Sequence, residues 1–135
     1  MNDADKFAVS GSSDPAPMPV CLLVEDEAVL ATLLEVEFTE AGFELAGPFK
    51  RVEDALRWLE TGTPDIAVID TMLVDGPSTR LALALKQRGV RFIVHSGSDQ
   101  GPAGTDQAFA GAPWLIKPIL PSAVVREVRH QLNLP

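Results

Sequence analysis

The sequence predicts an α/β fold in which helices cover both faces of a doubly wound, five-stranded parallel sheet. Three observations lead to this prediction. Short apolar runs of strand length recur from Val20 onward, amphipathic segments with helical spacing alternate with them, and 135 residues suffice for about one ordinary domain. A regular alternation of strand and helix is typical of right-handed βαβ units.

The first half of the chain contains the elements with the plainest patterns. Residues 20–24 (VCLLV) are continuously apolar, which suits a strand buried on both faces. A helical pattern then opens with the polar residues 25–27 and ends at Gly42, a suitable C′ residue. We expect a short strand over 43–47, and a second helix with its apolar face at Val52, Ala55, Leu56 and Leu59.

The second half repeats the alternation. Residues 66–69 and 92–94 read as buried strands, and the helix between them is expected to have Pro77 in its first turn and to end before Gly89. A last strand over 114–116 precedes a last helix over about 121–133. Between Ser96 and Trp114 the chain is rich in glycine, so any fourth helix there should be short and marginally stable.

Composition excludes several classes of protein. Lys and Arg total 11 against 19 Asp and Glu, a formal charge of −8, which argues against the nucleic-acid backbone or an anionic membrane as a partner. No apolar run could span a bilayer, and residues 1–19 contain no apolar core of a secretion signal. The lone Cys21 cannot form an internal disulfide, and no cluster suggests zinc. We expect a cytoplasmic domain over 20–135 behind a disordered tail over 1–19.

Five side chains suited to phosphoryl chemistry follow or end the predicted strands. The first strand delivers Glu25 and Asp26, the third Asp70, the fourth Ser96 and the fifth Lys117. The carboxyl ends of parallel strands are where such sheets bind ligands. We therefore expect three carboxylates, a hydroxyl and an ammonium group to converge at one edge of the sheet.

This group of side chains suggests a metal-dependent phosphoryl site. Three adjacent carboxylates repel one another, and Mg²⁺ relieves the repulsion because it prefers oxygen ligands. A carboxylate beside the ion can attack phosphorus and form an aspartyl phosphate. The ion and an ammonium group can neutralise the phosphoryl oxygens, while a hydroxyl can donate a hydrogen bond to one of them.

Each of these residues also has a simpler interpretation. The acids at 25–27 could merely favour a helix N-terminus, and Asp70 could be a turn residue. Ser96 could cap the next segment, and Lys117 could be a solvated surface charge. It is the occurrence of all five at successive strand ends that favours a functional site.

Four motifs carry a resemblance to a known family. Residues 24–27 (VEDE), 68–70 (VID), 95–97 (HSG) and 115–118 (LIKP) resemble the signature positions of response-regulator receiver domains of two-component signalling. The resemblance extends over about residues 20–134. It implies a flavodoxin-like strand order, 2-1-3-4-5.

The resemblance also implies a metal site that contains Mg²⁺. Asp70 would be the phosphoacceptor and a metal ligand, Asp26 a direct ligand, and Glu25 the holder of a metal-bound water. The main-chain carbonyl of Met72 would be a further ligand. The first acid is Glu25 where many members have Asp, a common variation with a longer side chain.

Further roles follow from the same resemblance. Lys117 would bind the phosphoryl group, Ser96 would be the switch hydroxyl, and the Lys117–Pro118 bond would be cis. Trp114 stands at the aromatic switch position, usually Tyr, Phe or His, but it could equally be a static, buried aromatic of an edge strand. Only 25 residues separate Asp70 from Ser96, which predicts a shorter third helix than usual.

The predicted function is a phosphoryl-accepting switch rather than an enzyme, phosphorylated by a sensor histidine kinase or a histidine phosphotransfer protein. The chain ends soon after the last helix, so we expect output through an unknown downstream protein or a phosphorelay, not through direct nucleic-acid binding or membrane insertion. One alternative is a receiver-like binding module that is never phosphorylated. An aspartyl-phosphate hydrolase is disfavoured because Met72 stands where it would need a second Asp.

Two further hypotheses concern surfaces that could change or bind. The first helix has one apolar stripe at Leu30, Leu34, Phe38 and Ala41 and a second at Val29, Leu33 and Val36. The second stripe either widens the core or docks the phosphodonor. Residues 97–112 could be mobile when Asp70 is free and ordered when it is phosphorylated, or simply a loose loop.

Overall fold

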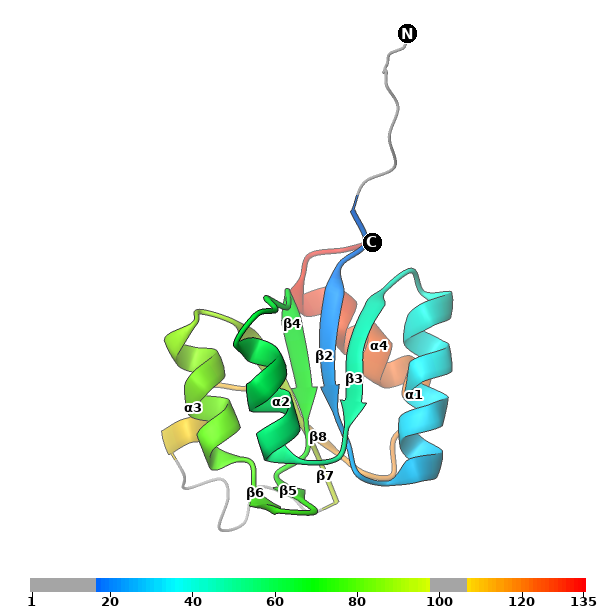
Figure 1. Cartoon of the computed structure of the whole chain (residues 1–135). Coiled ribbons are helices and arrows are strands. Elements are labelled where there is room, and N and C mark those ends of the chain that lie inside the picture. Colours follow the sequence, from blue (N-terminus) through cyan, green and yellow to red (C-terminus); the bar gives the residue numbers. More distant parts are fainter. Residues whose placement is uncertain (1–16, 98–106) are drawn as a thin grey trace, which may run out of the picture.

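The computed structural model describes residues 17–97 and 107–135 of the chain. Its main feature is a five-stranded parallel sheet (Figure 1), in the spatial order β3-β2-β4-β7-β8. These strands are β2 (Val20–Val24), β3 (Glu44–Phe49), β4 (Ile66–Ile69), β7 (Arg91–Ser96) and β8 (Trp114–Ile116). Numbered along the chain, the order is 2-1-3-4-5, which confirms the predicted doubly wound, flavodoxin-like topology.

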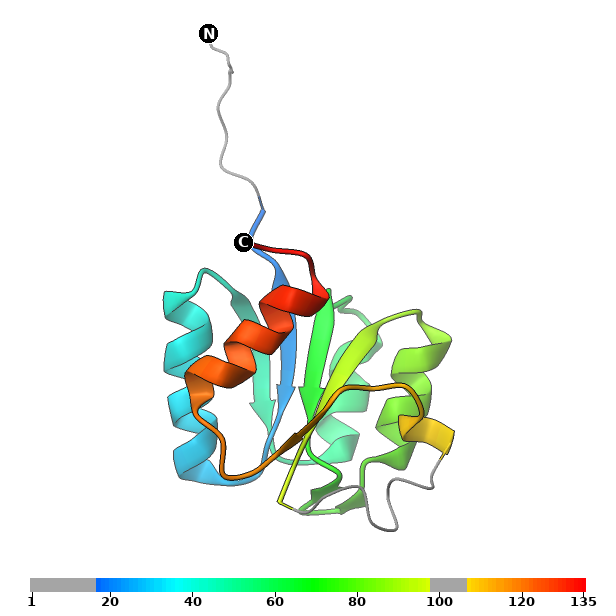
Figure 2. The same cartoon turned by 180° about the vertical axis from the view of Figure 1, so that it is seen from behind.

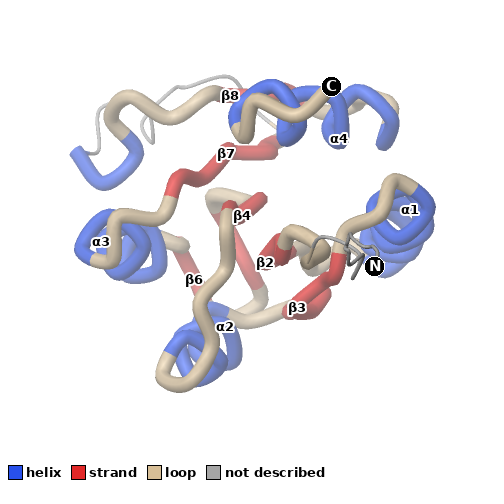
Figure 3. The backbone as a smooth tube through the Cα atoms, turned by 90° about the horizontal axis from the view of Figure 1, so that it is seen from above, coloured by secondary structure: helices blue, strands red, loops and turns tan. Residues whose placement is uncertain are grey.

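Helices cover both faces of the sheet, as the alternating pattern predicted. On one face lie α1 (Ala28–Glu40) and α4 (Pro121–Gln131), which contact each other; Figure 2 shows α4 beside α1. On the other face lie α2 (Val52–Leu59) and α3 (Thr79–Gln87), and Figure 3 shows the two pairs on opposite sides of the strands. A single 3-10 turn, η3 (Gln107–Phe109), packs against α3.

Two hydrophobic cores, one on each side of the sheet, hold these layers together. Side chains alternate along a strand, so Leu22 packs towards α2 and α3 while Leu23 packs towards α1 and α4. Both residues, which belong to β2, are fully buried, and so are all four residues of β4. This burial on both faces explains the continuous apolar runs of the central strands.

Two element boundaries differ from the sequence prediction near the first helix. The helix α1 begins at Ala28 rather than Glu25, since Glu27 has extended backbone angles at the N-cap. Strand β3 runs to Phe49 instead of ending at Gly47, through a cis Gly47–Pro48 bond. Gly47 has φ +106°, and a Cβ there would overlap with the carbonyl oxygen of Leu23.

The prediction of Pro77 in the first turn of a helix is wrong. A short antiparallel ladder, β5 (Met72–Leu73) with β6 (Gly76–Pro77), follows β4, and α3 starts only at Thr79. Pro77 pairs with Met72 in this ladder. The helix has nine residues, as expected for a short third helix.

The remaining elements agree more closely with expectation. The last helix ends at Gln131 rather than 133, and Ala108 and Phe109 of η3 are buried. The hypotheses on residues 1–16 and 98–106 lie outside the described residues. Within the described ranges, every helix is too short or too polar to cross a bilayer.

Candidate functional site

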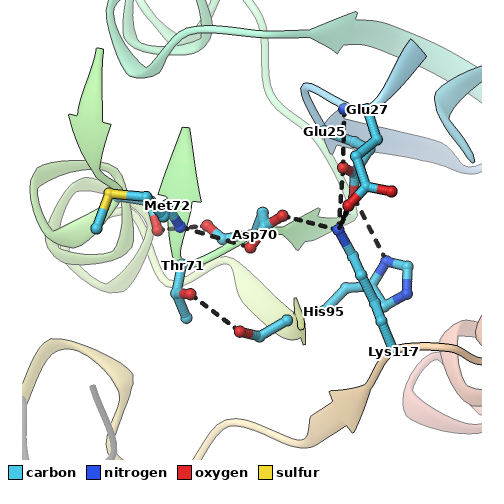
Figure 4. A network of polar contacts seen from close by, with 9 residues as sticks. Glu25, Glu27, Asp70, Thr71, Met72, His95 and Lys117 are labelled. Atoms are coloured by element: carbon cyan, nitrogen blue, oxygen red, sulfur yellow. Dashed lines mark hydrogen bonds and ion pairs between the residues drawn. The ribbon is translucent and has the colours of Figure 1, made fainter. Parts of the chain in front are cut away.

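The structure brings the predicted site residues to one edge of the sheet. Glu25 and Asp26 follow β2, Asp70 follows β4, Ser96 ends β7, and Lys117 follows β8. Because these strands are parallel, their carboxyl ends lie together, and Figure 4 shows the polar network formed there. Asp70 and Glu25 are buried, as is Ser96.

Lys117 is the centre of this network. Its Nζ lies 2.9 Å from Asp70 Oδ2, 3.0 Å from Glu25 Oε1 and 3.1 Å from Glu27 Oε2. Partial burial lowers the pKa of this ammonium group, but hydrogen bonds to Asp70 and Glu25 raise it more, so the net pKa is raised. Lys117 is therefore a permanent positive charge that joins the ends of three strands.

Glu25 is a buried carboxylate, 1% exposed. Burial raises its pKa, while the hydrogen bond from the Glu27 main-chain N–H (3.1 Å) and the charge of Lys117 counteract that rise. Its Oε1 forms an ion pair with Lys117 but accepts no hydrogen bond of good geometry from the described residues. A buried carboxylate oxygen of this kind has capacity for another positive partner.

Glu25, Asp26 and Asp70 can act as a set of metal ligands. One carboxylate oxygen of each lies within 4.8 Å of the others. Three anionic oxygens at this spacing suit a hard divalent cation such as Mg²⁺, which keeps water or phosphate in its other positions. The donor set therefore fits the predicted ion, and Asp70, Asp26 and Glu25 would hold it. The Met72 carbonyl stays a predicted ligand; the Met72 N–H lies 3.5 Å from Asp70 Oδ1.

The main chain after Asp70 is fixed by Ser78, which the sequence did not single out. The fully buried Ser78 hydroxyl donates a 2.6 Å hydrogen bond to the Asp70 carbonyl, and the Ser78 N–H donates to the Thr71 carbonyl (2.9 Å). The Thr71 hydroxyl, in turn, lies 3.0 Å from the Ser96 hydroxyl. The only sequence signal for these contacts was that the residue directly after Asp70, Thr71, is polar.

His95 lies behind the acidic cluster and is 1% exposed. Its Nδ1 is 3.7 Å from Glu25 Oε1, and neither ring nitrogen has a hydrogen-bond partner among the described residues. Burial, aided by the charge of Lys117, lowers the pKa of His95 to about 4. The imidazole is therefore neutral at pH 7, and it forms an uncharged, buried boundary of the site.

Trp114 and Pro118 lie on either side of Lys117 in the sequence. The Trp114 ring is half-buried and meets Phe109 edge to face, with ring centroids 6.1 Å apart. This contact fits the static interpretation, while its role as a switch stays a prediction. The Lys117–Pro118 bond is cis, as the family resemblance implied.

An apolar groove of about 480 Å³ opens beside the site. Val29 and Leu33 of α1 and Ile119 line it, and Lys117 and Glu27 form its polar end. Val29 is 75% exposed and Leu33 is 50% exposed. The groove thus joins an exposed apolar surface to the polar network around Asp70.

Comparisons with solved structures identify the fold. A CheY-like response-regulator receiver domain from Methanospirillum hungatei is 21% identical, with a TM-score of 0.77, and the match covers 87% of this chain and 95% of that one. The signal receiver domain of a modulated diguanylate cyclase from Desulfovibrio desulfuricans gives 23% identity, a TM-score of 0.76, and the same two coverages.

A third match is the chemotaxis response regulator CheY4 of Vibrio cholerae, at 16% identity and a TM-score of 0.73 over 84% of this chain and 98% of that one. No family model matches the sequence, and the search of curated proteins finds no relative. The chain therefore has the receiver-domain fold, and its acidic cluster lies at the end of the sheet where such folds bind ligands.

Proposed function

We propose that this domain is a phosphoryl-accepting signalling switch in which Asp70 is phosphorylated in a Mg²⁺-dependent reaction. One observation carries the proposal: Asp70 contacts Lys117 at 2.9 Å and belongs to a set of three carboxylates that suits a hard cation. The receiver-domain fold supports the same function. The phosphodonor would be a histidine kinase or a histidine phosphotransfer protein.

The reaction follows from the contacts of Asp70. One Asp70 carboxylate oxygen attacks the phosphorus atom, and the bond between phosphorus and the donor histidine nitrogen breaks, leaving its electron pair on that nitrogen. When bound, Mg²⁺ would supply positive charge to the phosphoryl oxygens. Lys117, now paired with Asp70 Oδ2, can stay beside the acyl phosphate and bind an oxygen of the transferred group.

The site favours holding the phosphoryl group over turning it over. Hydrolysis needs a group that activates water, and the position two residues after Asp70 is Met72, whose thioether cannot transfer a proton. The nearby His95 is buried, with its Nδ1 3.7 Å from Glu25 Oε1. We therefore propose slow loss of phosphate and no catalytic cycle; the cytoplasmic location stays a prediction.

We assign docking of the phosphodonor to the exposed stripe of α1 and the groove beside it. The other predicted stripe faces the core, since Leu34 and Phe38 are fully buried. Val29, Leu33 and Val36 stay exposed, and the first two line the groove that ends at Lys117. A donor helix lying there would bring its histidine to Asp70. The downstream target is a further, unidentified protein.

Labelling with a small-molecule phosphodonor tests the proposed function. Acetyl phosphate with Mg²⁺ should label the wild type to at most one phosphoryl group per chain, and Asp70→Asn should not be labelled. Glu44→Gln, on an exposed acid of β3, is the control and should be labelled like the wild type. Multiple turnover would favour a hydrolase, and absence of labelling would favour a module that acts by binding alone.

A further inference from the structure

The Thr71 and Ser96 hydroxyls meet at the ends of neighbouring strands. Thr71 follows β4 by two residues, Ser96 ends β7, and their oxygen atoms are 3.0 Å apart. Figure 4 shows Thr71 near Asp70, on the side away from Lys117, with a dashed line drawn from the Thr71 hydroxyl. Ser96 is 2% exposed, so the hydrogen bond lies at the inner wall of the site.

The position of the Thr71 hydroxyl is firmly set. The Thr71 carbonyl accepts a hydrogen bond from the Ser78 N–H, and the preceding carbonyl, of Asp70, accepts one from the buried Ser78 hydroxyl. Two bonds from one residue that directly precedes α3 therefore hold the main chain on both sides of Thr71. A β-branched side chain on a fixed main chain has few rotamers, which makes Thr71 a rigid partner for Ser96.

We propose that Thr71 is a positioning residue that holds the Ser96 hydroxyl in the unphosphorylated state and competes with the phosphoryl group on Asp70 for it. This inference rests on the proposed function, because it takes Ser96 to be the hydroxyl that contacts the phosphoryl group. Ser96 has one hydroxyl proton. If that proton points to Thr71, it must turn away before it can reach a phosphoryl oxygen; if Thr71 is the donor, the bond still holds the Ser96 rotamer.

The competition opposes phosphorylation without blocking it. Thr71 is half-buried, so water can replace Ser96 as the partner of its hydroxyl when the bond breaks. A contact that exists only in the unphosphorylated form lowers the affinity for a phosphoryl group, because a ligand shifts an equilibrium only by its differential affinity. A contact kept in both forms would stabilise the protein but leave that affinity unchanged.

The binding of beryllofluoride with Mg²⁺, a phosphoryl mimic, distinguishes these cases. Thr71→Val keeps the shape of the side chain and removes the hydroxyl, and it should bind the mimic about fivefold more tightly, the equivalent of one neutral hydrogen bond of about 1 kcal/mol. Thr71→Ser keeps the hydroxyl and should bind the mimic less tightly than Thr71→Val does. In a Ser96→Ala background, Thr71→Val should have no further effect, as a double-mutant cycle requires.

Affinity is measured by titration calorimetry on the full chain, after unfolding midpoints show that each variant is folded. Equal or weaker binding by folded Thr71→Val would overturn the competition, as would an undiminished effect in the Ser96→Ala background. If Thr71→Val does not fold, the inference depends on Thr71→Ala, which must also bind more tightly. A wild type that fails to bind the mimic, or an Asp70→Asn variant that binds it equally well, would overturn the proposed function itself.

Discussion

At the level of single residues, the negative charges around Lys117 outnumber the positive ones. One ammonium group contacts the carboxylates of Glu25, Glu27 and Asp70, and Asp26 lies beside them. Four acidic side chains against one cation leave an excess of negative charge that a divalent ion would offset. The same excess makes the affinity for the ion sensitive to the loss of any one carboxylate.

Replacing Asp26 should therefore weaken metal binding and phosphorylation together. Asp26→Asn keeps the size of the side chain but removes a charge and a proposed ligand, so we expect Mg²⁺ affinity to fall about tenfold or more, with a parallel fall in acetyl-phosphate labelling. Trp114 fluorescence can follow the titration once Trp58→Phe has removed the other tryptophan. Glu44→Gln, on an exposed acid of β3, is the control. Equal Mg²⁺ affinity in both variants would mean that the assigned metal site is wrong.

His95 gives the pH dependence of stability a defined sign. Its pKa is about 4 in the folded protein and about 6.5 in an unfolded chain, so between these values the unfolded state binds the proton. Its contribution to stability is thus present above pH 6.5 and lost as the pH falls towards 4, by at most about 1.4 kcal/mol per pH unit. His95→Gln should flatten this part of the urea-unfolding profile, with His130→Gln, on an exposed side chain, as control. An unchanged slope would contradict the buried, neutral state.

Residue type and position at a strand end were enough to predict where Glu25, Asp26, Asp70, Ser96 and Lys117 meet. Thr71 and Ser78 were missed because their hydrogen bonds depend on the path of the chain after Asp70. That path includes the β5–β6 ladder, which the sequence pattern did not reveal. The misplaced Pro77 and the missed Ser78 thus have one cause: two-residue strands are too short to show a period.

At the scale of elements, the turn of the β5–β6 ladder connects the site to α2. Asp75 accepts hydrogen bonds from the N–H groups of Val52 (2.8 Å) and Glu53 (3.2 Å), and the Lys50 carbonyl accepts one from Val74. The N-cap residue of α2, Arg51, forms no side-chain cap of its own. An acid 23 residues later in the chain therefore caps this helix.

Removing this long-range cap should destabilise the domain. Asp75→Ala should lower the midpoint of urea unfolding, because two N–H groups of α2 lose their partner. The hydrogen bonds that these N–H groups donate lower the pKa of Asp75 in the folded protein. The stability that Asp75 contributes is therefore present above the ordinary Asp pKa and is lost as the pH falls through the lower pKa of the folded state. The difference from wild type should shrink in strong acid. Glu35→Ala, on an exposed acid of α1, is the control; equal effects of the two variants would contradict the capping role.

The exposed stripe of α1 gives a second prediction at this scale. Val29→Glu adds a charge at the mouth of the groove and should slow phosphotransfer from a protein donor, since docking would bury that side chain. Labelling by acetyl phosphate, which needs no docking, should stay the same. Leu83→Glu, on an exposed apolar residue of α3, should leave both rates unchanged. A loss in both assays for Val29→Glu would instead indicate damage to the core.

The architecture of the whole molecule was the easiest level to predict. The buried strands are continuous apolar runs, and apolar residues recur at helical spacing in the segments between them, so the alternation predicts a sheet between two layers of helices. The hypothesis that residues 97–112 become ordered on phosphorylation stays a prediction, because residues 98–106 lie outside the described part of the chain. Its described end, η3, is anchored by Ala108 and Phe109 in the core beside α3.

The limit of the folded domain gives the last prediction. The first tertiary hydrogen bonds of the described chain involve Pro19, whose carbonyl accepts from Glu44 N–H (2.9 Å), and Val20, whose N–H donates to Asp65 Oδ2 (2.7 Å). A chain that starts at Pro17 keeps both. We therefore expect deletion of residues 1–16 to change the free energy of unfolding by less than about 0.5 kcal/mol and to leave acetyl-phosphate labelling unchanged.

A chain that starts at Cys21 is the matched control, because it loses both contacts at the edge of β2 and should unfold at a lower urea concentration. The two deletions differ by only four residues, so a difference between them locates the boundary of the domain near Pro19. If deleting 1–16 alone lowers the unfolding midpoint as much as the longer deletion does, the tail stabilises the fold and the domain starts earlier. If it changes labelling without changing stability, the tail acts on the site, and the boundary at residue 20 describes folding but not function.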